Sequence, residues 1–173
     1  MTQELSKEEL LDKIERTAQK YEEKYYGCAR CTLLALQENL NLGDDLTFQA
    51  STPLSAGIAW RGETCGALLG GLLAIGLVTA SKKIEDEPAF FDPMAEGFRL
   101  FRRFEKALGS SLCRDIQKAK FGRSFNLADP KEFEEFENAG GHAADGCPQV
   151  VGKAARLAAE FIMELREKQA IKD

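Results

Sequence analysis

The chain has 173 residues, of which 44% are hydrophobic and 29% are charged, a balance typical of one globular domain. Its formal net charge of −5 argues against a nucleic-acid-binding surface and against an anchor for anionic membranes. The sequence has five cysteines but a single histidine, His142, which excludes a multi-histidine zinc site, a facial triad and an H-E-x-x-H centre within one chain.

Helical signals dominate the first half of the chain. Ser6 and Glu9 form a capping-box pattern, and apolar residues then recur every three or four positions. The predicted segments are a first helix up to Tyr25, a helix over 28–40, a short helix after Asp44 or Asp45, a loop over 54–62 and an apolar helix from about Glu63. The apolar stretch of sixteen residues, 65–80, is shorter than the ~18 expected of a membrane-spanning helix, so we expect it to be a buried central helix.

The second half repeats these signals. Asp92-Pro93 predicts a helix start with proline in the first position, and Gly109 predicts its end. Further helix starts are predicted near Ser110, at Asp129-Pro130 and at Cys147-Pro148, and no segment shows the alternation of a strand. The sequence therefore predicts an all-α, single-domain helical bundle over residues 1–173. Exposed apolar faces of the first and last helices could pair between two copies of the chain, which would give a homodimer.

Four of the cysteines lie at or near the first turn of a predicted helix: Cys28, Cys65, Cys113 and Cys147. Unpaired N–H groups and the partial positive charge of a helix start stabilise an anion, which predicts a lowered thiol pKa. In a bundle such helix N-termini can converge, so we expect the four sulfurs to form one cysteine cluster in an electropositive pocket. Any one of them could instead be a small buried hydrophobe.

Three further residues are candidates beside this cluster. Cys31 lies one turn after Cys28 and could be a resolving thiol or an additional metal ligand. Gly66 could leave room around a reactive Cys65 sulfur. His142 lies in a glycine-rich loop and could supply a nitrogen ligand or a general base, or simply be solvated.

The order of the cysteines resembles the C_GCAxxG_C_C family of redox-active proteins, on Cys28-Ala29, Cys65-Gly66-Ala67-Leu68-Leu69-Gly70, Cys113 and Cys147-Pro148. The resemblance covers about residues 26–161 and leaves 1–24 as a leading helix outside the motif region. It implies a redox function with the four cysteines as key residues. A similar domain occurs in split-Soret-type cytochromes, for which the resemblance implies an iron–sulfur centre. The extra Cys31 and an insert from about Phe121 to Gly146 depart from the pattern.

Three functions fit these residues. The four thiolates could bind an iron–sulfur cluster and exchange electrons with a partner protein. Without a metal, Cys65 could be the reactive thiol of a dithiol–disulfide oxidoreductase, with Cys28 as its second catalytic thiol and a thiol redox protein as partner. The site could also bind or sense a soft metal without catalysis. Because four thiolates repel one another unless a cation or protons intervene, complete convergence favours a metal, and convergence of only two or three sulfurs favours the dithiol.

The remaining expectations concern location. The N-terminal segment is polar and charged, unlike a secretory signal peptide. We therefore expect a cytoplasmic protein with no stable membrane span, in which thiols stay reduced unless they bind metal or take part in redox chemistry.

Overall fold

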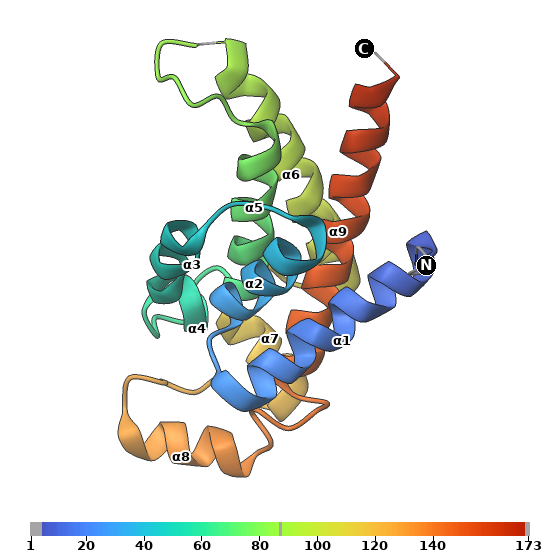
Figure 1. The fold of residues 1–173 in the computed structure, drawn as a ribbon. Coiled ribbons are helices and arrows are strands. Elements are labelled where there is room, and N and C mark those ends of the chain that lie inside the picture. The colour runs from blue at the N-terminus through green and yellow to red at the C-terminus, as the bar shows by residue number, and fades with distance from the viewer. Residues whose placement is uncertain (1–4, 87, 172–173) are drawn as a thin grey trace.

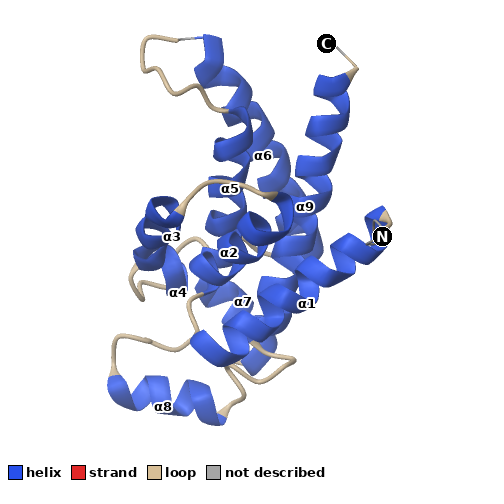
Figure 2. Ribbon diagram, viewed as in Figure 1, coloured by secondary structure: helices blue, strands red, loops and turns tan. Residues whose placement is uncertain are grey.

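The capping box at Ser6 starts the first helix, α1 (Lys7–Tyr25): the Ser6 hydroxyl accepts the Glu9 backbone N–H, and the Glu9 carboxylate accepts the Ser6 N–H. In the computed structural model of the protein, residues 5–86 and 88–171 are described, and they fold into helices joined by loops (Figure 1). Figure 2 shows no strand among them, and their one backbone bridge joins Thr64 to Leu112. The prediction of an all-α, single-domain protein is confirmed.

The helices after α1 follow in chain order: α2 (Cys28–Leu40), α3 (Asp45–Ser51), the 3₁₀ turn η1 (Thr52–Leu54), α4 (Ser55–Ile58), α5 (Gly66–Thr79), α6 (Pro88–Leu108), α7 (Cys113–Phe121), α8 (Pro130–Asn138) and α9 (Cys147–Ala170). Their starts at Cys28, Asp129-Pro130 and Cys147 agree with the sequence prediction. The helix stop at Gly109 also agrees, since its N–H donates to the Glu105 carbonyl and its φ is +82°.

Helix α5 is the central helix, packed against α2, α6 and α9. It is apolar on all sides, as expected of a buried helix, and its 14 residues are few for a membrane span. No helix in the described part of the chain is both long and apolar enough to cross a membrane. Gly70 permits its contact with α2, because a Cβ there would lie 2.4 Å from the Ala29 carbonyl oxygen. Gly71 likewise permits close packing, because a Cβ there would lie 3.2 Å from the Ala158 Cβ of α9 and 3.3 Å from the Leu100 Cδ2 of α6.

Helices α1 and α9 pack along each other, and their apolar faces form much of the core. Arg156 of α9 crosses this contact and forms ion pairs with Glu8, Asp12 and Glu15 of α1. The apolar faces of the first and last helices therefore contact each other within one chain, and they are not the exposed faces that the sequence predicted for dimer contacts.

Two predicted boundaries are wrong. Helix α6 begins at Pro88 rather than at Pro93, because Pro88 already occupies the favourable first position, and Pro93 lies inside the helix. The predicted loop over 54–62 begins at the last residue of η1 and contains α4, and its backbone is left-handed from Ala56 to Trp60.

Candidate functional site

Each of the four predicted cysteines starts a helix. Cys28, Cys113 and Cys147 are the first residues of α2, α7 and α9, and Cys65 immediately precedes α5. The expected placement at helix starts is confirmed. A glycine permits the turn into α2. Gly27, directly before Cys28, has a φ of +95°, which a residue with a side chain rarely adopts.

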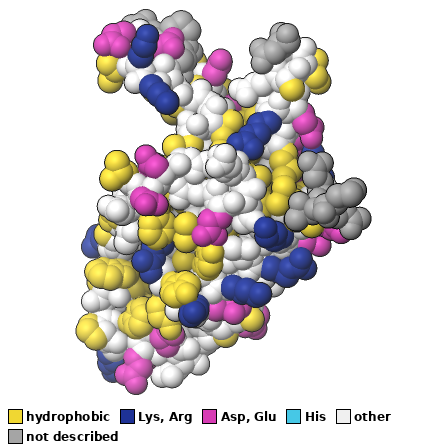
Figure 3. Space-filling view, viewed as in Figure 1, with side chains coloured by type: hydrophobic (Ala, Val, Ile, Leu, Met, Phe, Trp, Pro, Cys, Tyr) yellow, Lys and Arg dark blue, Asp and Glu magenta, His cyan; other side chains and the backbone are white. Residues whose placement is uncertain are grey.

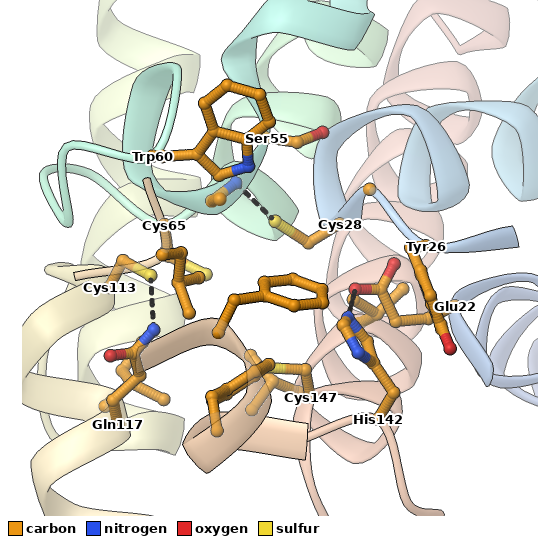
Figure 4. A pocket seen from close by; sticks show the side chains of 18 of the residues that line it. Glu22, Tyr26, Cys28, Ser55, Trp60, Cys65, Cys113, Gln117, His142 and Cys147 are labelled. Atoms are coloured by element: carbon orange, nitrogen blue, oxygen red, sulfur yellow. Dashed lines mark hydrogen bonds and ion pairs between the residues drawn. The ribbon is translucent and has the colours of Figure 1, made fainter. Parts of the chain in front are cut away.

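The four helix starts converge on one cavity of about 270 Å³, and all four cysteines line it. Figure 4 shows Cys28, Cys65, Cys113 and Cys147 around this space, each from a different helix start. The first three are buried and Cys147 is partly buried, and all four are free thiols. The structure thus gathers residues that are up to 119 positions apart in sequence (147 − 28) into one site.

Backbone hydrogen bonds fix Cys65 beside Cys113. The segments before α5 and α7 run antiparallel: the Cys65 N–H donates to the Ser111 carbonyl at 2.8 Å, and the Cys113 N–H donates to the Glu63 carbonyl at 2.7 Å. The bridge between Thr64 and Leu112 lies between these two bonds. The two cysteines are therefore positioned by rigid backbone rather than by side-chain contacts alone.

Groups from three segments surround the Cys28 sulfur. A Cβ at Gly66 would lie only 2.5 Å from its Sγ, so this glycine leaves room for the Cys28 sulfur. The Ala56 N–H donates to the Cys28 Sγ at 3.4 Å (Figure 4). Cys65 lines the same cavity and is the neighbour that raises the pKa of the Cys28 thiol most.

The Ala56–Trp60 segment has an unusual backbone at the edge of the cavity. All five of its residues have φ between 48° and 67°, a region that costs residues with side chains roughly 1–2 kcal/mol each. Gly57 is required there, because a Cβ would lie 2.7 Å from the Cys113 Cβ and 2.6 Å from the Glu63 backbone nitrogen. This conformation places the Ala56 N–H against the Cys28 sulfur.

The pKa values of Cys28, Cys113 and Cys147 are raised, whereas their helix starts had predicted lowered values. The hydrogen bond with Cys65 and then burial raise the pKa of Cys28, and burial raises the pKa of Cys113 to about 12 and that of Cys147 above its usual value. Removal from water disfavours each thiolate more than a helix end favours it. The pocket is also not electropositive: its lining includes the Glu22 carboxylate, and no Lys or Arg among the described residues lines it.

The insert over 121–146 forms one wall of the cavity. It contains α8, which places Phe133 and Phe136 in the lining, and the loop that carries His142. Phe136 is buried and meets Phe121 edge-on at a centroid distance of 5.5 Å. Figure 3 shows hydrophobic side chains gathered on the face where α4 and α8 lie. The part of the chain that departs from the motif therefore completes the site.

His142 lies between two carboxylates and is not solvated. Its Nδ1 contacts the Glu137 carboxylate, its Nε2 lies 3.7 Å from the Glu22 Oε1, and its ring stacks on Tyr26 at 3.9 Å (Figure 4). Because both nitrogens face carboxylates, the arrangement suits hydrogen bonding better than ligation of a metal at the sulfurs.

Glu22 is the site residue that sequence reasoning missed. It belongs to the leading helix, α1, yet it lines the cavity with an exposed fraction of 2%, and burial raises its pKa to about 7. Within the described structure its Oε2 has no hydrogen-bond partner. A signal was present, because Glu22 continues the spacing of the buried residues Ile14 and Ala18.

Cys31 lies outside the cavity. Its Sγ donates to the Tyr26 carbonyl at 3.3 Å and belongs to a separate hollow beside Tyr21 and Phe48. The structure therefore does not bring Cys31 together with the other four thiols.

Residues 26–161 match the C_GCAxxG_C_C family, which is described as a putative redox-active protein family. The chain belongs to this family. The matched range includes all five cysteines, of which Cys28, Cys65, Cys113 and Cys147 line the cavity and Cys31 lies outside it. Glu22 lies just outside the matched range. Comparisons with curated proteins and with solved structures gave no match.

Proposed function

We propose that this redox-active family member uses its four-cysteine cavity to bind an iron–sulfur cluster and to transfer electrons to and from a partner protein. The observation that supports the proposal is the convergence of Cys28, Cys65, Cys113 and Cys147 from four helices on one cavity of about 270 Å³. Thiolates are the protein ligands of such clusters.

The buried thiols need a positively charged occupant to ionise. Burial raises the pKa of Cys113 to about 12 and raises that of Cys147, so without an occupant these sulfurs keep their protons at neutral pH. A metal centre can displace those protons because it compensates the thiolate charge directly. This requirement favours a metal centre over a set of four ionised, uncompensated thiols.

A single bound metal ion has less support than a cluster. One zinc ion would need its sulfurs at about 2.3 Å from one point. Among the described residues, no group of three or more His, Cys, Asp or Glu side chains is arranged to hold a metal ion in that way. The four cysteines instead line a cavity of about 270 Å³, which has room for a group of several metal atoms.

The chain's own residues would then hold and tune the site. The four cysteines would be its ligands, and when bound, the cluster supplies the electron-carrying chemistry. The Ala56 N–H donates to the Cys28 Sγ at 3.4 Å, and the Gln117 Nε2 donates to the Cys113 Sγ at 3.6 Å (Figure 4). Such N–H···S bonds stabilise negative charge on sulfur and raise a reduction potential. The insert wall of Phe133, Phe136 and His142 limits the access of water.

The test compares two cysteine variants after anaerobic purification or anaerobic reconstitution with iron and sulfide. Cys65→Ser removes a cavity thiol, whereas Cys31→Ser is the matched control, because Cys31 is equally buried but lies outside the cavity. We expect visible absorbance with stoichiometric iron and sulfide in wild type and in Cys31→Ser, and a loss of iron in Cys65→Ser. Equal iron content in wild type and Cys65→Ser would contradict the proposal.

A dithiol–disulfide function is the second candidate; it is supported by the shared cavity of Cys28 and Cys65 and by the effect of Cys65 on the pKa of the Cys28 thiol. In this reaction the two thiols lose two electrons and two protons as their S–S bond forms, and a disulfide of the redox partner is reduced to two thiols. A colourless protein whose thiol count falls by two on mild oxidation, but stays constant in Cys28→Ser, would favour this function over the cluster.

A further inference from the structure

Residues 56–62, which we call the strap, form part of the wall of the cysteine cavity. The first N–H of the strap donates to the Cys28 Sγ at 3.4 Å, and the backbone of Gly57 packs closely against the Cys113 Cβ. Cys65 follows the strap after two further residues. Figure 1 shows α4 and the loop after it at the edge of the molecule. The strap therefore contacts or directly precedes three of the four cavity cysteines.

The three thiols beside the strap are buried. The exposed fractions of Cys28, Cys65 and Cys113 are 9%, 5% and 8%. Trp60 of the strap lines the same cavity, and Figure 4 shows it on the side where Cys28 and Cys65 lie. Exchange with a partner disulfide requires direct attack of one sulfur on another, and binding of a metal group requires contact with each ligand. Either redox function therefore requires that part of the cavity wall move.

The strap is the strained part of this wall. Four of its residues have a side chain and a φ between 48° and 65°: Ala56, Ile58, Ala59 and Trp60. Such a φ is a marked outlier for Ile58, which is β-branched. Packing does little to offset this strain, because Ile58 is 40% exposed, Trp60 is 57% exposed and Ala59 is exposed. Strain of this kind concentrates at ligand clamps and switch regions.

The hydrogen bonds of the strap are comparable in free energy with its strain. Opening would exchange four of them for bonds to water: Ala56 N–H to the Cys28 Sγ, Ala59 N–H to the Pro53 carbonyl, Gly62 N–H to the Ala56 carbonyl and Glu63 N–H to the Gly57 carbonyl. The net contribution of four such bonds is similar in size to the cost of four left-handed residues. The closed and open strap are therefore close in free energy, as in segments that open without global unfolding.

We infer that the strap is a gate, which opens by relaxing its left-handed backbone and uncovers Cys28, Cys65 and Cys113. Its C-terminal end stays attached, because the Gly62 carbonyl accepts the Arg114 N–H of α7 at 3.0 Å. Gly62 itself has a φ of +71°, and a glycine can change its backbone angles there at little cost. The inference concerns access to the cavity and holds for either redox function.

Alkylation of the reduced, metal-free full chain by iodoacetamide, resolved by peptide mass spectrometry, tests the inference. Ala59→Gly removes one exposed methyl group and relieves strain, so it favours the closed strap. We expect Cys28, Cys65 and Cys113 to react about threefold more slowly in this variant. Ala80→Gly is the matched control, because Ala80 is also exposed but has an ordinary φ of −81° at the end of α5. It should leave the three rates unchanged.

Gly57→Ala should act in the opposite direction. Its Cβ would lie 2.6 Å from the Glu63 backbone nitrogen and 2.7 Å from the Cys113 Cβ, so the closed strap must shift. We expect the three cavity thiols to react at least about tenfold faster, with the helix content checked by circular dichroism. Cys31 is the internal control, because it is buried outside the cavity, and its rate should not change in either variant.

Amide hydrogen exchange over residues 55–63 gives a second measurement that does not depend on thiol reactivity, and Ala59→Gly should slow it by a similar factor. Cavity thiols that react equally fast in wild type and Ala59→Gly would overturn the inference, and so would rates that change only together with that of Cys31. If Gly57→Ala does not fold, Ala59→Gly decides. A chain that binds no iron contradicts the proposed cluster but leaves these rates as expected.

Discussion

Gly66→Ala is the sharpest test of how the cysteine cavity is built. The added Cβ would lie 2.5 Å from the Cys28 Sγ, 2.9 Å from the Leu54 carbonyl oxygen and 3.0 Å from the Ser55 Cα. Ordinary contacts of a Cβ lie at 3.4–4 Å. Two of the three obstructing atoms belong to backbone and cannot rotate away, so the start of α5 must move away from η1, α4 and Cys28.

The expected loss of stability follows from these contacts. Overpacking of this kind costs about 1–3 kcal/mol, and the backbone contacts place Gly66→Ala at the upper end. The lower entropy of the unfolded alanine chain returns up to about 1 kcal/mol. We therefore expect the free energy of unfolding to fall by about 2 kcal/mol, which corresponds to a Tm lower by about 4–8 °C in a chain of this length.

Gly76→Ala in the same helix is the control. A Cβ at Gly76 meets nothing within 4 Å, so the substitution should raise the free energy of unfolding by about 0.5–1 kcal/mol through helix propensity and chain entropy. Urea unfolding followed by circular dichroism measures both variants. If the two alanines change stability equally, or if Gly66→Ala is the more stable, then Cys28 and the start of α5 are not in close contact and the cavity is wider than described.

Three further predictions concern the walls of the site. Burial raises the pKa of Glu22 to about 7, so its contribution to stability is complete below the unfolded value of about 4.5 and is lost as pH rises through 7. Relative to Glu22→Gln, wild type should therefore lose about 3 kcal/mol between pH 4.5 and 8 in urea unfolding, and a difference that is flat with pH would contradict this. Phe136→Ala should cost about 3–5 kcal/mol, because the ring is 1% exposed, and unchanged unfolding would show that the insert does not pack on the body. Asp129→Ala should lower the free energy of unfolding by about 1 kcal/mol, because it removes the acceptor for the Lys131 and Glu132 N–H groups. Asp129→Asn keeps a side-chain oxygen as acceptor and should retain most of this stabilisation. The rate of amide hydrogen exchange in α8 measures the effect of both substitutions.

Local signals made the helix starts predictable. The Ser6 capping box, the Asp129 cap before Pro130 and the Cys147-Pro148 pair each act within one turn, so the residues that decide the structure are adjacent in sequence. The start of α6 was missed because Pro88 and Pro93 both fit the first position of a helix. The left-handed run from Ala56 carries no such signal, since only one of its five residues is glycine.

The chemistry of the site was less predictable than its position. The helix starts at Cys28, Cys113 and Cys147 indicated low thiol pKa values, but burial depends on α8 and α1, which pack there from distant parts of the chain. Desolvation by those elements reverses the sign of the effect. Glu22 was overlooked for a related reason, because a charged residue on an apolar stripe becomes informative only when the cavity that it faces is known.

The charge of the cavity links these observations to function. Four thiols and the Glu22 carboxylate surround one space, and no cationic side chain among the described residues lines it. Ionising several of these groups together is unfavourable there, since each added charge raises the pKa of the next, as Cys28 and Glu22 do for Cys113. Electrons can be stored at such a site in two ways: as protonated dithiol, with the protons moving together with the electrons, or on a metal group that cancels the thiolate charge. A midpoint potential that falls by about 60 mV per pH unit marks the first, and one that is nearly independent of pH marks the second, so the pH dependence of the potential separates the two redox functions even when both leave Cys65 essential.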